Sequence, residues 1–185
     1  MEKNNFYIIT GGPGVGKTTL INALKRAGFL TIEEEARKII KAQIALDGQG
    51  VPWKNKELYA RLMLDASAET FEEVSNSGVS DPVFFDRGIL DTICYMNMET
   101  ISLPEEVSDI TQRCIYNKNV FLLPPWKEIY ERDAERKQSW KEAVDTFDRM
   151  KETYSDYGYS IILLPKASVV ERRNCVIDFL RRDVS

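Results

Sequence analysis

One stretch, residues 11–18, constrains the fold of this chain more than any other. It reads Gly-Gly-Pro-Gly-Val-Gly-Lys-Thr and matches the pattern G-x-x-x-x-G-K-[ST]. The apolar run 6–10 before it predicts a buried strand, and apolar residues at 20, 21 and 24 predict a helix after it. Between a strand and a helix, this pattern is typical of a loop that binds phosphate groups. We therefore expect the chain to bind a nucleoside triphosphate here.

The residues of this loop have separate expected roles. Glycines let the backbone approach the phosphates closely, and successive N–H groups and the helix N-terminus point at the anion. Lys17 is expected to reach the β- and γ-phosphates, and Thr18 to ligate Mg²⁺. ATP is the expected nucleotide, with GTP as an alternative. The expected nucleotide-binding residues are Gly11, Gly12, Pro13, Gly14, Val15, Gly16, Lys17, Thr18 and Thr19.

The rest of the chain alternates between short apolar runs and longer helical patterns. Further strands are expected at 29–32, 82–86, 120–123 and 159–164, and helices at 33–40, 54–76, 89–98, 104–116, 127–155 and 169–182. Strands that alternate with helices predict an α/β fold with a parallel sheet and right-handed crossovers. A chain of 185 residues suffices for one such domain, which we expect to span 1–185.

Composition excludes several classes of function. The net charge of −4 argues against nucleic acid as a main partner. The chain has no histidine, which removes histidine acid–base catalysis and makes a transition-metal site unexpected. No apolar run approaches the roughly 20 residues of a membrane span, and the three cysteines are widely spaced. We expect a cytoplasmic protein without a membrane partner.

Charged residues follow the second predicted strand. Ligands of parallel sheets bind beyond the carboxyl ends of the strands, so these residues are candidates for the site. Glu34 could accept the proton of an attacking hydroxyl or bind a sugar hydroxyl, and Arg37 shares its helix face. Glu33 could take the same role, and acidic residues are also common in a first helical turn for stability alone.

The third strand and a later helix add further candidates. Asp86 ends an apolar strand in the manner of a Walker B acidic residue, which holds Mg²⁺, although it could instead cap the next helix. Arg87 could hold an anionic group of a second substrate or form a surface salt bridge. Arg132 and Arg136 could belong to a lid, at about residues 126–140, that closes over the triphosphate, or they could lie on a solvated helix face.

Together these motifs resemble a known family. The loop, the E-x-A-R of 34–37, the F-D-R-G-I-L-D of 85–91, the D-x-x-R of 133–136 and the G-Y-S-I-I of 158–162 are similar to P-loop kinases of nucleosides and nucleotides. More closely they resemble the small AAA-type ATP-binding domains related to the ribosylnicotinamide kinase domain. The resemblance implies a three-layer P-loop NTPase fold with a five-stranded parallel sheet of order 2-3-1-4-5 and a helical lid.

The resemblance also implies a function and a catalytic set. The set is Lys17, Glu34, Asp86, Arg132 and Arg136, with Arg37 and Arg87 as substrate-binding residues and Thr18 and Asp86 on Mg²⁺. We expect a kinase that transfers the γ-phosphate of ATP to a small nucleoside- or nucleotide-like acceptor. The alternatives are an ATPase or nucleotide-dependent switch that acts on a protein partner, and a binding module with little turnover. The residues leave the acceptor and the oligomeric state open.

Overall fold

The apolar runs of the sequence form one parallel sheet. The computed structural model describes residues 3–130 and 139–183. Within them, five parallel strands lie in the order β2-β3-β1-β4-β5, so the predicted α/β fold and strand order are confirmed. The strands are β1 (Phe6–Gly11), β2 (Leu30–Ile32), β3 (Val83–Asp86), β4 (Asn119–Leu123) and β5 (Ser160–Leu163).

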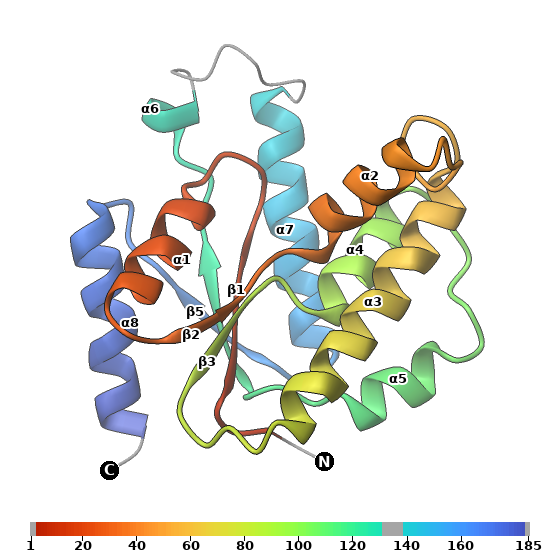
Figure 1. The fold of residues 1–185 in the computed structure, drawn as a ribbon. Helices are drawn as coiled ribbons and strands as arrows, with labels where there is room; N and C mark the ends of the chain where they lie inside the picture. Colours follow the sequence, from red (N-terminus) through yellow and green to blue (C-terminus); the bar gives the residue numbers. More distant parts are fainter. Residues whose placement is uncertain (1–2, 131–138, 184–185) are drawn as a thin grey trace.

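Helices cover both faces of this sheet. Figure 1 shows α1 and α8 on one face and α3, α4 and α7 on the other, so the molecule has three layers. The described helices are α1 (Lys17–Arg26), α2 (Glu35–Ala45), α3 (Lys56–Asn76), α4 (Ile89–Met98), α5 (Val107–Arg113), α6 (Lys127–Tyr130), α7 (Trp140–Asp156) and α8 (Val169–Asp183).

The central strand shows how the sequence divides the core. Side chains alternate between the two faces of a strand. Tyr7 and Ile9 of β1 therefore pack in a cluster with apolar residues of α1 and α8, while Phe6 and Ile8 pack with those of α3 and α4. All four are nearly inaccessible to solvent. Burial of this kind on both faces fixes the register of β1, because a slip of one residue would exchange the two sets.

Some element boundaries differ from expectation. The helix expected over 104–116 is the shorter α5, because Pro104 lies in a turn, where its carbonyl accepts from the N–H of Val107 at 3.1 Å. The helix expected from 33 begins at Glu35, with Glu34 as its N-cap. Of the helix expected over 127–155, the structure describes α6 and α7, and residues 131–138 lie outside the described part of the chain. No helix of the described ranges is long and apolar enough to span a bilayer.

Candidate active site

The phosphate-binding motif forms the turn between β1 and α1. Gly11 ends the strand and Lys17 begins the helix. Gly14 and Gly16 adopt positive φ angles of 74° and 84°, a region that side chains other than glycine rarely enter. The helix N-terminus therefore faces the space above the sheet, which is the arrangement that binds anions through free N–H groups.

Arg172 of α8 contacts the backbone of this loop, and it was not anticipated from the sequence. Its Nη1 donates to the carbonyl of Val15 at 3.0 Å. A Cβ on Gly16 would lie 2.9 Å from the same nitrogen, so only glycine fits against the guanidinium. Arg172 is buried, and burial lowers its pKa. No sequence signal near residue 172 could have found it, because the contact joins residues 157 positions apart.

Lys17 and Asp86 form a buried ion pair at the loop. Lys17 Nζ lies 2.8 Å from Asp86 Oδ1, and the two side chains are only 7% and 9% exposed. Burial, and then the nearby Arg87, lower the pKa of Lys17 more than Asp86 raises it. Apart from this ion pair, Asp86 Oδ1 is a buried oxygen without a hydrogen-bond partner. Asp86 does not cap the next helix, whose N-cap is Gly88.

The structure brings Glu34, and not Glu33, into contact with the other candidates. Glu33 is exposed, whereas Glu34 Oε1 accepts from Arg87 Nε at 2.7 Å and Glu34 Oε2 lies 3.4 Å from Arg37 Nε. Burial raises the pKa of Glu34, but the charges of Arg87 and Lys17 outweigh it, and the pKa lies below its usual value. Glu34 is therefore an ionised carboxylate at neutral pH.

Arg87 is held between two carboxylates. Besides Glu34, it binds Asp91, whose Oδ1 lies 3.0 Å from Arg87 Nη1. Burial lowers the pKa of Arg87, but the charges of Asp91 and Glu34 raise it by a larger amount. The net shift is upward, so the guanidinium stays charged. The backbone of Arg87 adopts a φ of 76°, which is uncommon for a residue with a side chain. Of the two alternatives for Arg87, the structure shows a salt bridge, which is partly buried and not on the surface.

Asp91 anchors this arrangement and was absent from the sequence-based candidates. Its Oδ2 accepts from the N–H of Gly88 at 2.9 Å and from the hydroxyl of Tyr154 at 2.5 Å, and its Oδ1 also accepts from the hydroxyl of Thr10. The carboxylate thereby joins β1, the start of α4 and α7. Its position three residues after Gly88 is that of a helix-capping carboxylate, a signal that the sequence did offer.

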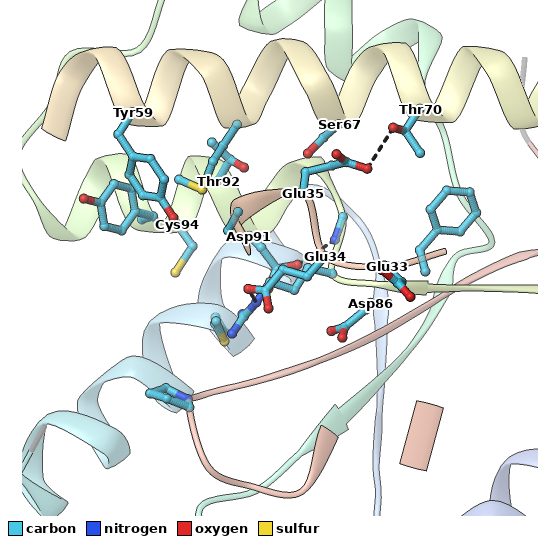
Figure 2. Close-up of a pocket in the computed structure, with 18 of the residues that line it drawn as sticks. Glu33, Glu34, Glu35, Tyr59, Ser67, Thr70, Asp86, Asp91, Thr92 and Cys94 are labelled. Carbon is cyan, nitrogen blue, oxygen red and sulfur yellow. Dashed lines mark hydrogen bonds and ion pairs between the residues drawn. The ribbon is translucent and has the colours of Figure 1, made fainter. Parts of the chain in front are cut away.

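A cavity of about 320 Å³ opens beside the loop. Pro13, Glu34, Asp86, Arg87 and Asp91 are among its lining residues. Figure 2 shows Asp86 and Glu33 toward one end of this space and Tyr59 and Cys94 at the other, beneath a long helix that carries Ser67 and Thr70. A cavity of this size is within the range of small-molecule sites.

The residues present fit a magnesium ion held together with phosphate oxygens. Mg²⁺ prefers oxygen ligands and keeps several waters, with one or two carboxylates beside substrate phosphates. The buried Asp86 oxygen without a hydrogen bond and the exposed hydroxyl of Thr18, which lies 3.5 Å from Arg37 Nη2, supply such oxygens. The described residues contain no cluster of three or more His, Cys, Asp or Glu side chains arranged for a metal. Arg132 and Arg136 lie outside the described residues.

Comparison with known proteins identifies the relatives of this fold. A family model described as an AAA domain matches residues 6–172. The chain is similar to the NadR protein solved in complex with NR, at 19% identity and a TM-score of 0.71 over 97% of this chain. It covers 51% of that protein and so spans about half its length. No curated protein matches the sequence.

Two kinases align along nearly their whole length. A deoxyadenosine kinase from M. mycoides shares 16% identity at a TM-score of 0.62, with 96% of this chain and 99% of that chain covered. A thymidylate kinase from Ehrlichia chaffeensis shares 16% identity at a TM-score of 0.62, with 95% and 97% covered. Identities this low establish a common fold, which is that of P-loop nucleoside and nucleotide kinases.

Proposed function

The chain belongs to the AAA domain family, and from this premise and the geometry of its site we propose that it is a kinase. It transfers the γ-phosphate of ATP to a small nucleoside- or nucleotide-like acceptor. The family accounts for nucleotide binding, and the kinase fold of its structural neighbours supports phosphoryl transfer.

One observation carries the kinase proposal against the ATPase alternative. The cavity of about 320 Å³ lies directly beside the phosphate loop, and Asp86 and Glu34 line it. An ATPase needs room for a water molecule at the γ-phosphate, whereas a kinase needs a second compartment for an organic acceptor. The size and the partly apolar lining of this cavity fit the second requirement.

The phosphate loop supplies the electrostatic part of the reaction. Gly11–Thr19 hold the triphosphate through backbone N–H groups and the N-terminus of α1. Lys17 leaves Asp86 and binds the β- and γ-phosphates, where it offsets the charge of the transferring group. Thr18 and Asp86 would hold Mg²⁺, which would supply further neutralisation of phosphate charge.

Glu34 orients the acceptor. The acceptor oxygen forms a bond to the γ-phosphorus while the bond from that phosphorus to the departing ADP oxygen breaks. Because the transition state of such transfers is loose, positioning contributes more than early deprotonation. An ionised Glu34 with a lowered pKa accepts a hydrogen bond from the hydroxyl and takes up its proton late, and Arg87 holds the carboxylate in place. Arg132 and Arg136 remain predicted lid residues.

The test is ATP consumption with and without a panel of nucleosides, ribosylnicotinamide and monophosphates. A kinase should show consumption that depends on one acceptor and a phosphorylated product of that acceptor by mass spectrometry. Acceptor-independent hydrolysis that no compound accelerates would refute the proposal and favour the ATPase.

Variants separate the two halves of the site. Lys17→Ala should abolish ATP binding or turnover, whereas Lys25→Ala, an exposed change at the other end of α1, should not.

Glu34→Gln should keep ATP affinity and lose turnover by about 10² to 10⁴-fold, the usual range for a group that handles the proton. Glu69→Gln, on an exposed position of α3, is its control. Loss of ATP affinity in Glu34→Gln would contradict the assigned role.

A further inference from the structure

The peptide bond between Val15 and Gly16 lies within the phosphate-binding loop, directly before α1. Gly16 is the N-cap of this helix and adopts a left-handed conformation, with φ 84° and ψ 22°. Gly14, two residues earlier, has a φ of 74°. Backbone N–H groups next to left-handed residues form concave surfaces that bind anions. The direction in which the N–H of Gly16 points therefore matters for the binding of phosphate.

Arg172 contacts the carbonyl of this same peptide. Its Nη1 donates to the oxygen of Val15 at 3.0 Å, in a buried contact. A peptide unit is planar, and in the trans form its C=O and N–H point in opposite directions. The peptide between Val15 and Gly16 is trans. Because its carbonyl faces Arg172, its N–H faces away from α8, so one side chain sets the direction of a second backbone group.

The guanidinium of Arg172 is held in a fixed place. Ser168 Oγ accepts from the N–H of Glu171 at 3.3 Å, and Glu171 Oε2 accepts from the N–H of Ser168 at 2.9 Å. This capping box fixes the first turn of α8. Figure 1 shows α8 beside α1, and apolar residues of both helices share one buried cluster. The ring of Trp126 packs over the guanidinium, with its centroid 5.8 Å from Arg172 Cζ.

Gly16 is fitted to this contact as well. A Cβ at this position would lie 2.9 Å from Arg172 Nη1 and 3.0 Å from Nη2. The guanidinium therefore lies against the backbone of Gly16 while it donates to Val15. The loop needs glycine here for its positive φ, and the close approach of Arg172 is a second reason for the same residue.

Stability alone explains an arginine at this place poorly. Arg172 is only 7% exposed, and its Nε is a buried nitrogen without a hydrogen-bond partner among the described residues. A buried donor without a partner destabilises a fold, and burial lowers the pKa of Arg172 because it disfavours the charged form. Apolar side chains of similar volume often replace buried charges without loss of stability. A guanidinium here is better explained by a role in binding.

From this geometry we infer that Arg172 is a positioning residue of the phosphate site. It holds the carbonyl of Val15 and thereby turns the N–H of Gly16 toward the space where the phosphates of a nucleotide bind. It also polarises this N–H, because a hydrogen bond to the carbonyl strengthens the donor at the other end of the same peptide. The inference rests on nucleotide binding, which is one part of the proposed function, and does not depend on phosphoryl transfer.

The affinity for a non-hydrolysable ATP analogue with Mg²⁺, measured by calorimetry, tests the inference. Arg172→Met keeps a long side chain but removes the donors and the charge, so affinity should fall about tenfold to a hundredfold, the effect of a hydrogen bond to a charged group. Arg172→Lys keeps a charged donor and should recover most of this loss. Arg182→Met makes the same change on an exposed position at the other end of α8 and should leave affinity unchanged.

Two results of this titration would overturn the inference. One is an Arg172→Met protein that binds the analogue as tightly as the wild type. The other is an Arg172→Lys protein that binds it as weakly as Arg172→Met, because a charged donor at this position would then not be what the loop requires.

A spectroscopic signature separates positioning from a purely structural contact. Val15–Gly16 is the one Val–Gly pair of the sequence. Labelling with carbonyl-¹³C valine and ¹⁵N glycine therefore gives a single NMR correlation, which reports this peptide alone. Without ligand, loss of the hydrogen bond in Arg172→Met should move the Val15 carbonyl resonance upfield. Saturating nucleotide should move the Gly16 amide proton downfield in the wild type, and by a smaller amount in Arg172→Met.

The wild-type spectrum keeps the inference testable if Arg172→Met does not fold. A Gly16 amide proton that does not move when the wild type is saturated with nucleotide would show that this N–H does not bind phosphate, and the inference would fail. A Val15 carbonyl resonance that is identical in wild type and Arg172→Met would also overturn it.

The outcomes separate this inference from the proposed function. If Arg172→Met loses affinity as expected but the wild type phosphorylates no acceptor, the inference stands and the kinase proposal fails. If the wild type phosphorylates an acceptor and Arg172→Met binds the ATP analogue equally well, the kinase proposal stands and the inference fails. If the wild type does not bind the analogue, both fail.

Discussion

Replacement of Asp91 by asparagine should destabilise the protein far more than its size-conserving nature suggests. The four contacts of the carboxylate are all with donors: the hydroxyls of Thr10 and Tyr154, the N–H of Gly88 and Nη1 of Arg87. An asparagine offers one acceptor oxygen and one donor group in the same space. The hydroxyls can rotate to accept, but the N–H groups of Gly88 and Arg87 cannot.

The size of the effect follows from these contacts. Whichever way the amide turns, one buried N–H faces another donor, which costs about 1–3 kcal/mol. The Arg87 pair also loses one of its two charges, and removal of one partner from a buried ion pair costs about 3–5 kcal/mol when the other partner is left alone. Glu34 still binds Arg87, so we expect a total loss of about 3–5 kcal/mol, a large share of the roughly 5–15 kcal/mol of a typical domain.

Urea unfolding followed by fluorescence measures this loss. Asp65→Asn makes the same chemical change on an exposed position of α3 and should alter the free energy of unfolding by less than about 0.5 kcal/mol. If Asp91→Asn does not fold, Tyr154→Phe removes a single hydroxyl from the same carboxylate and should cost about 2 kcal/mol. An Asp91→Asn protein within about 1 kcal/mol of the wild type would refute the reasoning, because the network would then not depend on the charge.

Other features lead to further predictions. Gly16→Ala places a Cβ at a φ of 84° and 2.9 Å from Arg172 Nη1, so nucleotide affinity should fall by at least about tenfold in a fluorescence titration. Burial raises the pKa of the Cys94 thiol to about 11, whereas Cys175 is exposed; iodoacetamide at about pH 8 should therefore modify Cys175 first by mass spectrometry, and equal rates would contradict this. Because the pKa of Glu34 is lowered from 4.5, its ion pair contributes stability above that value and loses it as the pH falls through the folded-state pKa. The difference in unfolding free energy between wild type and Glu34→Gln should stay constant from about pH 7 to about pH 5 and shrink below that.

Much of the fold could be predicted because the relevant signals are local. The loop motif carries its own spacing, and each strand is a short apolar run bounded by turn residues. The order of the strands came instead from the resemblance to a family, since parallel partners are far apart in the chain. The pairing of Ile8 with both Phe85 and Val120, for example, leaves no trace in local sequence.

The sequence indicated individual residues of the site but not the contacts between them. Glu34, Asp86 and Arg87 follow predicted strands, and the structure places all three in the lining of one cavity. Both Glu33 and Glu34 line that cavity, and which of the two contacts Arg87 depended on the first residue of α2, a boundary that sequence patterns do not resolve. The contacts of Asp91 with Thr10 and Tyr154 span 81 and 63 residues and require the folded sheet.

The ion pair between Lys17 and Asp86 means that the loop carries its own counter-ion. Inorganic phosphate that bound Lys17 alone would displace the buried carboxylate from its ion pair. Under the proposed function, a triphosphate accompanied by a divalent cation would satisfy both residues at once, the lysine with phosphate oxygens and the carboxylate with the metal. Under the proposed function, the loop should therefore bind a nucleotide together with its metal more tightly than inorganic phosphate.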